Sequence, residues 1–382
     1  MSIEIKTVGC RQNQYESIIL KNLIDKKLIF KDINNTILIN SCSVTSRAMR
    51  DTRKIINKAK RSGKNIILTG CVIDKNLIED PEVIYLSNNE KHKIVYKDTN
   101  EYDPILSRPM ISIETGCDKF CSYCIVPYLR GRPIIREFGK ITDEISFLAD
   151  KGFVEFVLTG TNIAMAGNLI RKILNWANES YSDIQFRLSS MDPDYLKSNI
   201  DIYEKSNVVH TAHISMQSLS NNVLIDMKRR HKFEDIHKIT HTLLEFDPLF
   251  AVGGDLIIGF PSEGQYEFEE TYSHLEELPL AYVHFFEYSD RNGTLASVMK
   301  NKCCSNEIKE HIHKVQNLVN KKKKAFKIKN IGHTLDAIAL NDNRVLTTNY
   351  LNVFADKIAP RKSKVKIHIE DLKEDKLYGR II

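Results

Sequence analysis

The sequence feature that most constrains the fold is a regular alternation of short apolar runs with amphipathic stretches near the start of the chain. Three apolar runs have the length and composition of strands, at residues 3–8, 36–39 and 66–69. Helical patterns over about residues 13–26 and 46–61 separate them. Strands that alternate with helices favour a parallel sheet packed against helices. Residues 1–100 are therefore predicted to form an α/β domain around a doubly wound parallel sheet.

A cysteine follows each of these predicted strands within three residues, as Cys10, Cys42 and Cys71. In an open parallel sheet, functional groups gather outside the carboxyl ends of the strands. Any one of these cysteines could be a small buried hydrophobic residue. Three at equivalent topological positions predict a common site instead. We expect their thiolates to hold an iron–sulfur cluster that keeps one iron free of protein ligands.

A second group of cysteines, Cys117, Cys121 and Cys124, has C-x3-C-x2-C spacing directly after the apolar run at residues 110–113. A cubane iron–sulfur cluster held only by protein needs four thiolates, so three leave one iron open. In clusters that initiate radical chemistry, that iron binds the amino and carboxylate groups of S-adenosylmethionine (SAM). A structural zinc loop is the alternative, although zinc sites favour paired cysteine knuckles with four ligands, and no second pair lies nearby.

Six repeats of strand and helix are predicted downstream of a polar segment at residues 93–108, which we interpret as a linker. The predicted strands lie at residues 110–113, 153–159, 184–189, 209–215, 250–258 and 282–286. Helical patterns separate them, for example at residues 142–150 and 234–246. The repeats predict a partial (β/α)6 barrel over residues 101–325, with its site at the carboxyl ends of the strands.

Small or polar residues just beyond these predicted strands are candidates for binding the cofactor. They are Thr159, Gly160, Ser189 and Gln217. Small residues there let a cofactor approach the backbone closely. Arg229, which follows the fourth barrel strand, could direct its guanidinium at a carboxylate or a phosphate. By contrast, three histidines are expected to be satisfied in or near the core rather than to act as ligands, namely His210, His213 and His284.

Composition argues against a membrane or secreted protein. No run of apolar residues is long enough to span a bilayer, and the first residues lack the anatomy of a signal peptide. We therefore expect a cytoplasmic protein with no membrane partner, in a compartment where thiols stay reduced. In that setting the 8 cysteines of the chain are expected to be metal ligands or catalytic groups rather than disulfides.

The C-terminal region differs in pattern and in charge. A lysine-rich segment at residues 321–327 is interpreted as a basic hinge, and short alternating runs follow it at residues 334–340, 345–348, 351–354, 364–369 and 376–381. Several short strands with turns between them predict a small β-barrel over residues 326–382. Residues 301–382 hold 18 Lys and Arg against 9 Asp and Glu. This surplus suggests a polyanion such as RNA as the partner, with an ordinary solvated charged face as the alternative.

Taken together, these motifs resemble those of the radical-SAM methylthiotransferases across nearly the whole chain. The matching segments are residues 9–17, 40–45, 70–71, 116–127, 130–132, 188–193 and 259–261. Residues 348–353 are similar to part of the RNA-binding TRAM domain that ends these enzymes. Residues 43–45 and 130–132 are most similar to the branch of the family that acts on N6-threonylcarbamoyladenosine in tRNA.

The resemblance implies a chemistry and its partners. Two [4Fe-4S] clusters would be held by Cys10, Cys42 and Cys71 and by Cys117, Cys121 and Cys124, with Tyr123 among the residues that bind SAM. The implied reaction adds a methylthio group to C2 of N6-threonylcarbamoyladenosine at position 37, in the anticodon stem-loop of a tRNA. An electron donor such as flavodoxin or ferredoxin would supply the electron.

Three alternatives stay open at this point. The same chemistry could act on N6-isopentenyladenosine in tRNA, which is the substrate of a sister branch of the family. The N-terminal cluster could be a passive electron-transfer centre, so that no carbon–sulfur bond forms. A zinc-bearing RNA-binding module would need no SAM at all.

Overall fold

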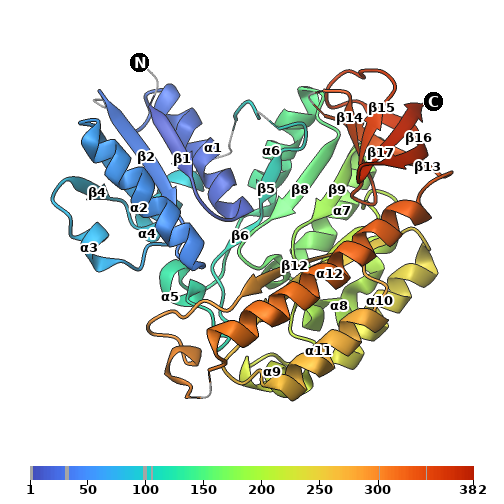
Figure 1. Cartoon of the computed structure of the whole chain (residues 1–382). Coiled ribbons are helices and arrows are strands. Elements are labelled where there is room, and N and C mark those ends of the chain that lie inside the picture. The colour runs from blue at the N-terminus through green and yellow to red at the C-terminus, as the bar shows by residue number, and fades with distance from the viewer. Residues whose placement is uncertain (1–2, 31–33, 98–100, 105, 301, 341) are drawn as a thin grey trace.

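The computed structural model describes residues 3–30, 34–97, 101–104, 106–300, 302–340 and 342–382. The chain folds into an N-terminal α/β region, a central partial barrel and a small C-terminal β-barrel, which follow one another from blue to red in Figure 1. In the described ranges, no helix combines the length and the apolar character needed to cross a membrane.

The N-terminal sheet has four parallel strands that follow one another in chain order. They are β1 (Glu4–Thr7), β2 (Thr36–Ser41), β3 (Asn65–Gly70) and β4 (Val83–Tyr85). Leu38 and Ile67 face α1 (Arg11–Asp25), whereas the alternate residues Ile37 and Ile66 pack against α2 (Ser46–Arg61) on the other face. Helices therefore cover both faces, and the three predicted strands and two predicted helices are confirmed.

The segment after β4 is more ordered than the sequence suggested. Helix α4 (Asn88–Val95) forms there, and Val95 and Tyr102 are buried in the main core; the shorter α3 (Lys75–Ile78) lies between β3 and β4. The interpretation of residues 93–108 as a polar linker is therefore wrong where these apolar side chains pack. The predicted domain boundary at residue 100 lies outside the described residues, since residues 98–100 are not among them.

The central region contains the six predicted parallel strands. They are β5 (Met110–Ser112), β8 (Glu155–Thr159), β9 (Gln185–Leu188), β10 (Thr211–Gln217), β11 (Ala251–Ile258) and β12 (Tyr282–Glu287). They form two three-stranded parallel sheets, and single bridges such as Met191–Ile214 link β9 to β10. Helices on the outside are α6 (Phe138–Asp150), α7 (Leu169–Ser180), α8 (Pro193–Asn199), α9 (Asn221–Asp226), α10 (Phe233–Phe246) and α11 (Gln265–Glu277). The partial βα barrel is confirmed.

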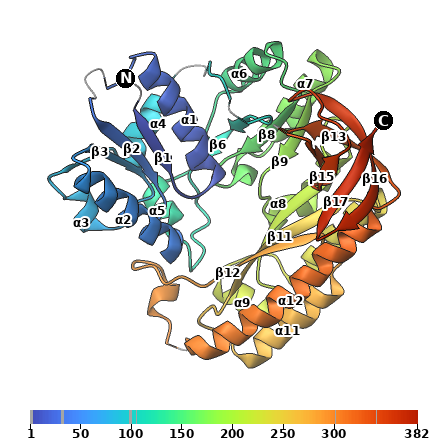
Figure 2. The same ribbon diagram turned by 45° about the horizontal axis from the view of Figure 1, so that its top comes forward.

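The first two regions share one hydrophobic core. Helix α1 lies between the N-terminal sheet and the barrel (Figure 2), and its residues Tyr15, Ile19 and Leu20 are fully buried in the same cluster as Ile111 of β5. A buried hydrogen bond from the Tyr15 hydroxyl to Glu144 Oε2, 3.0 Å long, adds a polar link to α6. Apolar contacts of this extent hold the sheet in a fixed position on the barrel.

A single long helix, α12 (Ser305–Lys329), leads from the barrel to the C-terminal region. The interpretation of residues 321–327 as a hinge is wrong, because these lysines form the last turns of α12. Lys322 Nζ donates to the carbonyls of Glu276 and Leu278 at 2.9 and 2.7 Å, which fixes the helix to the end of α11. The predicted boundary between residues 325 and 326 falls inside this helix and stays a prediction.

The C-terminal region is a closed five-stranded barrel, as predicted. Its strands are β13 (Thr334–Ala339), β14 (Arg344–Thr347), β15 (Asn352–Ala355), β16 (Lys364–Lys373) and β17 (Lys376–Ile381), in the order β13-β14-β15-β17-β16. Small and branched apolar residues fill its interior, among them Ala337, Val353 and Ile367.

The turn between β14 and β15 reaches the amino-terminal ends of the central barrel strands. Arg187 of β9 donates to the carbonyls of Thr347 and Thr348 at 3.3 and 3.5 Å. Asn349 Nδ2 donates to the carbonyl of Leu249 just before β11, at 2.9 Å. Tyr350, held at a positive φ of 71°, places its ring 5.2 Å from the Arg187 guanidinium. The turn therefore closes this end of the central barrel.

Candidate active site

The topology brings the N-terminal cysteines to one edge of the sheet. Cys10, Cys42 and Cys71 follow β1, β2 and β3, and Cys42 and Cys71 are buried. Gly9 has a φ of +105°, and a Cβ at that position would lie 2.4 Å from Cys42 Cβ and 2.9 Å from Cys42 Sγ. Only glycine therefore lets the Cys10 segment approach Cys42 so closely. Their convergence follows from the strand order; their role as ligands stays a prediction.

The second group of cysteines lies on a loop that folds back on itself. The loop follows the short strand β6 (Glu114–Thr115), which pairs with β7 (Ile134–Ile135). The Cys117 amide donates to the Gly131 carbonyl at 3.1 Å, and a Cβ on Gly116 would lie 2.3 Å from the Arg132 carbonyl oxygen. The loop is thus pinned at its base, and the sulfurs of Cys117 and Cys121 lie near side chains of the barrel.

Polar groups from the barrel point at these sulfurs. Arg229 Nη1 lies 3.7 Å from Cys121 Sγ, and Asn162 Nδ2 lies 4.0 Å from Cys117 Sγ. Donors close to cluster sulfurs are a usual means of tuning an iron–sulfur centre. The arginine is itself held by an ion pair with Asp192 Oδ2 at 3.2 Å and by a hydrogen bond to the Ser215 carbonyl at 2.9 Å.

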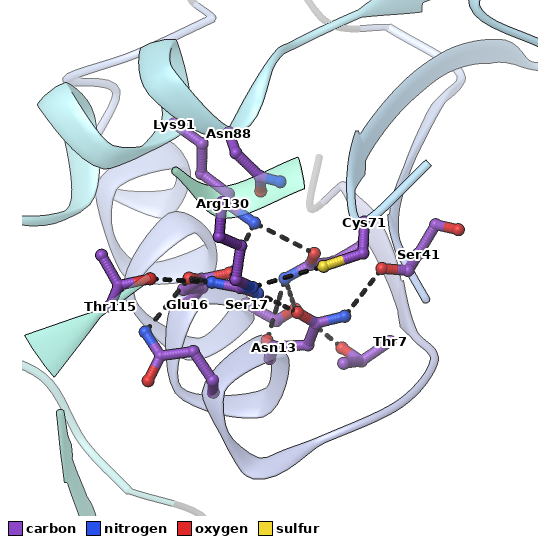
Figure 3. Close-up of polar contacts among 12 residues, drawn as sticks. Thr7, Asn13, Glu16, Ser17, Ser41, Cys71, Asn88, Lys91, Thr115 and Arg130 are labelled. Carbon is purple, nitrogen blue, oxygen red and sulfur yellow. Dashed lines mark hydrogen bonds and ion pairs between the residues drawn. The ribbon is translucent and has the colours of Figure 1, made fainter. Parts of the chain in front are cut away.

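Arg130 connects Cys71 of the first group with Thr115, which lies just before the second cysteine loop (Figure 3). It belongs to α5 (Val126–Arg130), directly behind the second cysteine loop, and its Nε lies 3.3 Å from Cys71 Sγ of the first group. The same guanidinium donates to Glu16 Oε1 at 2.7 Å, to Asn13 Oδ1 at 2.5 Å and to Thr115 Oγ1 at 3.0 Å. One side chain therefore spans the sheet edge, α1 and the cluster loop.

Glu16 is the buried carboxylate at the centre of this network. Lys91 Nζ lies 2.5 Å from Glu16 Oε2, and the side chains of Glu16, Lys91 and Arg130 are at most 3% exposed. Burial alone would raise the pKa of Glu16, but the charges of Arg130 and Lys91 outweigh it and lower that pKa to about 2. Two cations and one anion thus lie together in a buried site. Removing any one of them would leave the other charges without full compensation.

The described cysteines suit a cluster better than a single zinc ion. All eight cysteines are free. Tetrahedral zinc with Zn–S bonds of about 2.3 Å would bring its sulfurs within roughly 3.8 Å of one another. Across the described ranges, the only group of possible ligands whose atoms all lie within 4.8 Å of each other is His213, Asp255 and His284. Neither group of cysteines is that compact, which disfavours the zinc alternative.

Burial also keeps the thiols from acting as nucleophiles by themselves. Burial raises the pKa of Cys42 and that of Cys124 to about 12. Neighbouring thiols, Cys71 among them, raise the pKa of Cys124 further. At neutral pH these thiols are protonated unless a metal takes the place of the proton.

The predicted cofactor-binding residues lie at or just beyond the carboxyl ends of the barrel strands, apart from Tyr123, which lies on the second cysteine loop. Thr159 ends β8, Ser189 follows β9, and Gln217 ends β10 at a positive φ of 69°. Gly160 leaves no room for a side chain, since a Cβ would lie 2.2 Å from Glu114 Oε1. Tyr123 packs against an apolar cluster that includes Phe260, and its hydroxyl interacts with Cys121. The roles of all these residues and of Arg229 stay predictions.

The structure adds several polar residues that sequence reasoning did not select. Glu114 is buried beside the cluster loop, accepts a hydrogen bond from the Asn162 amide at 2.5 Å, and has a pKa that burial raises to about 7. The position of Glu114 at the end of an apolar run, just before the cysteines, could have identified it as a candidate site residue from the sequence. No sequence signal identified Lys91, because it lies in an ordinary polar stretch and is buried only by tertiary packing.

Polar residues also line the inner face of β10, β11 and β12. Asp255 Oδ2 lies 3.0 Å from His213 Nε2, and Asp255 Oδ1 lies 3.6 Å from His284 Nδ1. Burial would raise the pKa of Asp255, but the two imidazoles hold it well below its usual range. His210 pairs with Asp247 at 2.6 Å. All three histidines thus have a carboxylate partner, as a satisfied histidine requires.

Comparison with known proteins agrees with this arrangement. The Radical SAM superfamily matches residues 111–275, and the Uncharacterized protein family UPF0004 matches residues 2–84. The structure of the radical S-adenosylmethionine methyltransferase TsrM from Kitasatospora setae, with cobalamin and a [4Fe-4S] cluster bound, is similar in fold. It has a TM-score of 0.56 and 12% sequence identity, over 78% of this chain and 77% of that one.

Sequence relatives are similar over nearly the whole chain. Threonylcarbamoyladenosine tRNA methylthiotransferase MtaB of Aquifex aeolicus is 32% identical, over 92% of this chain and 96% of the relative. The protein of that name from Rickettsia prowazekii is 31% identical, over 93% and 91%. The tRNA-2-methylthio-N(6)-dimethylallyladenosine synthase of Buchnera aphidicola is 29% identical, over 83% and 82%. The chain belongs to the radical-SAM methylthiotransferase family and is an enzyme of that class.

Proposed function

We propose that the protein adds a methylthio group to C2 of N6-threonylcarbamoyladenosine at position 37 of a tRNA. The observation that carries this proposal is the position of the two groups of cysteines, which Arg130 connects through its contacts with Cys71 and the cluster loop. A sulfur group carried at one site and a radical formed at the other could then act on one carbon atom. The names of the Aquifex and Rickettsia relatives support the same base as substrate.

The residues present fit two iron–sulfur clusters. Cys117, Cys121 and Cys124 would hold the cluster that binds SAM, and Cys10, Cys42 and Cys71 would hold the second one. The bound cluster and SAM supply a carbon radical able to remove hydrogen from an unactivated carbon. The protein's own contribution is placement: Arg229 is positioned by Asp192, Gly160 lets the Glu114 carboxylate pack against the backbone, and the buried surroundings exclude water.

The C-terminal barrel has features that suit RNA. Phe354 and Tyr378 stack with their ring centroids 5.6 Å apart, and Lys376 Nζ lies 5.8 Å from the Phe354 ring. Tyr378 and Lys376 are both exposed. Aromatic rings beside cations are a common platform for nucleotides, since bases stack on the rings and phosphates pair with the cations. We propose this surface as the contact with the anticodon stem-loop of the tRNA.

Nucleoside analysis tests the proposal directly. The gene would be expressed in a bacterial host that lacks its own enzyme for this base, and digested tRNA would be analysed by mass spectrometry. The 2-methylthio derivative of N6-threonylcarbamoyladenosine should appear only when the gene is present. The derivative of N6-isopentenyladenosine would identify the other substrate, and SAM cleavage by the purified enzyme with no methylthio product would indicate a passive second cluster. A cytoplasmic location and a flavodoxin or ferredoxin as electron donor stay predictions.

A further inference from the structure

Arg11 carries a positive charge that no carboxylate of the described residues neutralises. It follows Cys10 directly, it is half-buried, and its Nη1 lies 3.5 Å from Ser189 Oγ on the barrel. It forms no ion pair in the parts of the chain that the structure describes. A cation in the first turn of a helix also opposes the helix dipole, so the stability of α1 does not explain this residue.

The acidic groups near Arg11 already have partners. Glu155 accepts from Arg187 Nε at 3.0 Å and lies 3.6 Å from Arg108 Nη1, so two arginines share its one charge. Burial lowers the pKa of Arg108, and the nearby charges of Arg187 and Arg11 lower it further. Two guanidinium groups therefore share a single carboxylate, and Arg11 adds a third positive charge near Arg108. The excess of positive charge favours an anionic ligand.

Two aromatic rings lie near Arg187, whose guanidinium is 5.2 Å from the Tyr350 ring. The rings of Tyr282 and Tyr350 have centroids 5.4 Å apart. The Tyr282 ring packs directly over Gly253, where a Cβ would lie 2.4 Å from the ring. A larger residue at position 253 would therefore displace the ring. Burial raises the pKa of Tyr282, and the charge of Arg11 is among those that oppose this rise.

We propose that the Arg11 guanidinium binds the carboxylate of the threonyl group on the substrate base and so selects N6-threonylcarbamoyladenosine over adenosines with an uncharged N6 substituent. The inference rests on the proposed function. In adenine, C2 and the carbon that bears N6 both flank N1. A group that contacts the N6 substituent must therefore lie close to the group that delivers sulfur to C2.

Arg11 meets this requirement because it is the neighbour of Cys10, a proposed ligand of the sulfur-carrying cluster. A guanidinium and a carboxylate match as a two-pronged pair of charged hydrogen bonds. An isopentenyl group is a hydrocarbon and offers no anion, so a pocket with an unpaired arginine would bind it poorly. SAM also carries a carboxylate, and the experiment must separate this second source of the same chemistry.

The test compares Arg11→Gln, Arg11→Lys and the wild type on three anticodon stem-loops that differ only at position 37. One carries N6-threonylcarbamoyladenosine, one its methyl ester, and one N6-isopentenyladenosine. For the wild type, kcat/KM should be highest for the free acid. Arg11→Gln should lower kcat/KM for the acid by about 10²-fold, as the loss of a buried charged pair predicts, and should remove most of the preference for acid over ester. Arg11→Lys should keep part of that preference, because it keeps the charge.

Two measurements keep the result interpretable. Iron and sulfide content must match the wild type, and Lys21→Gln, an exposed change on the same helix, serves as the matched control. An equal loss for the acid and the ester, or a rise in the KM for SAM with an unchanged preference, would overturn the proposal. A wild-type enzyme that methylthiolates only the isopentenyl stem-loop would instead refute the proposed function itself.

Discussion

Replacing Glu16 with Gln is expected to destabilise the protein strongly without changing its shape. The substitution keeps the size of the side chain but removes the one negative charge between Arg130 and Lys91. Both cations would stay buried with no anion in contact. Removing one partner of a buried ion pair typically costs about 3–5 kcal/mol, because the remaining charge is left without compensation.

The pKa of Glu16 gives a separate measure of the same interaction. The carboxyl titrates at about 2 in the folded protein against 4.5 for an unperturbed group. At about 1.4 kcal/mol per pKa unit, this difference corresponds to roughly 3 kcal/mol of stability. Because the folded pKa is the lower one, this stability is present above pH 4.5 and is lost as the pH falls towards 2. Glu16→Gln should lack this part of the acid dependence.

Urea unfolding of metal-free protein under anaerobic conditions measures the effect. The midpoint should fall while the slope stays unchanged, which would indicate a change in stability alone. Asp25→Asn is the matched control, since it breaks the exposed 2.6 Å pair with Lys21 on the same helix and should cost no more than about 0.5 kcal/mol. Glu16→Gln combined with Lys91→Met should be more stable than Glu16→Gln. A loss for Glu16→Gln no larger than for Asp25→Asn would refute the reasoning.

Three further predictions concern the proposed chemistry. Cys121→Ala should abolish 5′-deoxyadenosine formation yet leave about half of the iron bound, because one of the two proposed clusters would remain; full SAM cleavage by this variant would contradict the assignment. Cys42→Ala should still cleave SAM but form no methylthio product, and normal product would show that the N-terminal cysteines are structural. Phe354→Ala with Tyr378→Ala should weaken tRNA binding by roughly 2 kcal/mol or more, from the loss of two stacking faces; unchanged affinity in a filter-binding titration would argue against the proposed RNA surface.

Local sequence patterns predicted the features that follow from the order of strands and helices. They did not predict contacts between residues far apart in the chain. Cys10, Cys42 and Cys71 could be placed together from sequence alone, because equivalent strand ends share an edge of a parallel sheet. The hinge at residues 321–327 was a wrong interpretation, since lysine is also a good helix former and α12 simply continues through it. The pairing of Arg130 with Glu16 joins residues 114 positions apart and left no local trace.

The turn that carries Tyr350 gives the small C-terminal barrel a mechanical role. Arg187 binds the backbone of this turn, and the Asn349 side chain donates to the Leu249 carbonyl. The small barrel is therefore fixed to the end of the central barrel opposite the cysteines. A nucleic acid gripped by the small barrel would then be held at a constant offset from the reacting centre. The distance between the small barrel and the reacting centre would then be fixed. That distance, rather than the neighbouring bases, would decide which nucleotide of the folded RNA reaches the centre.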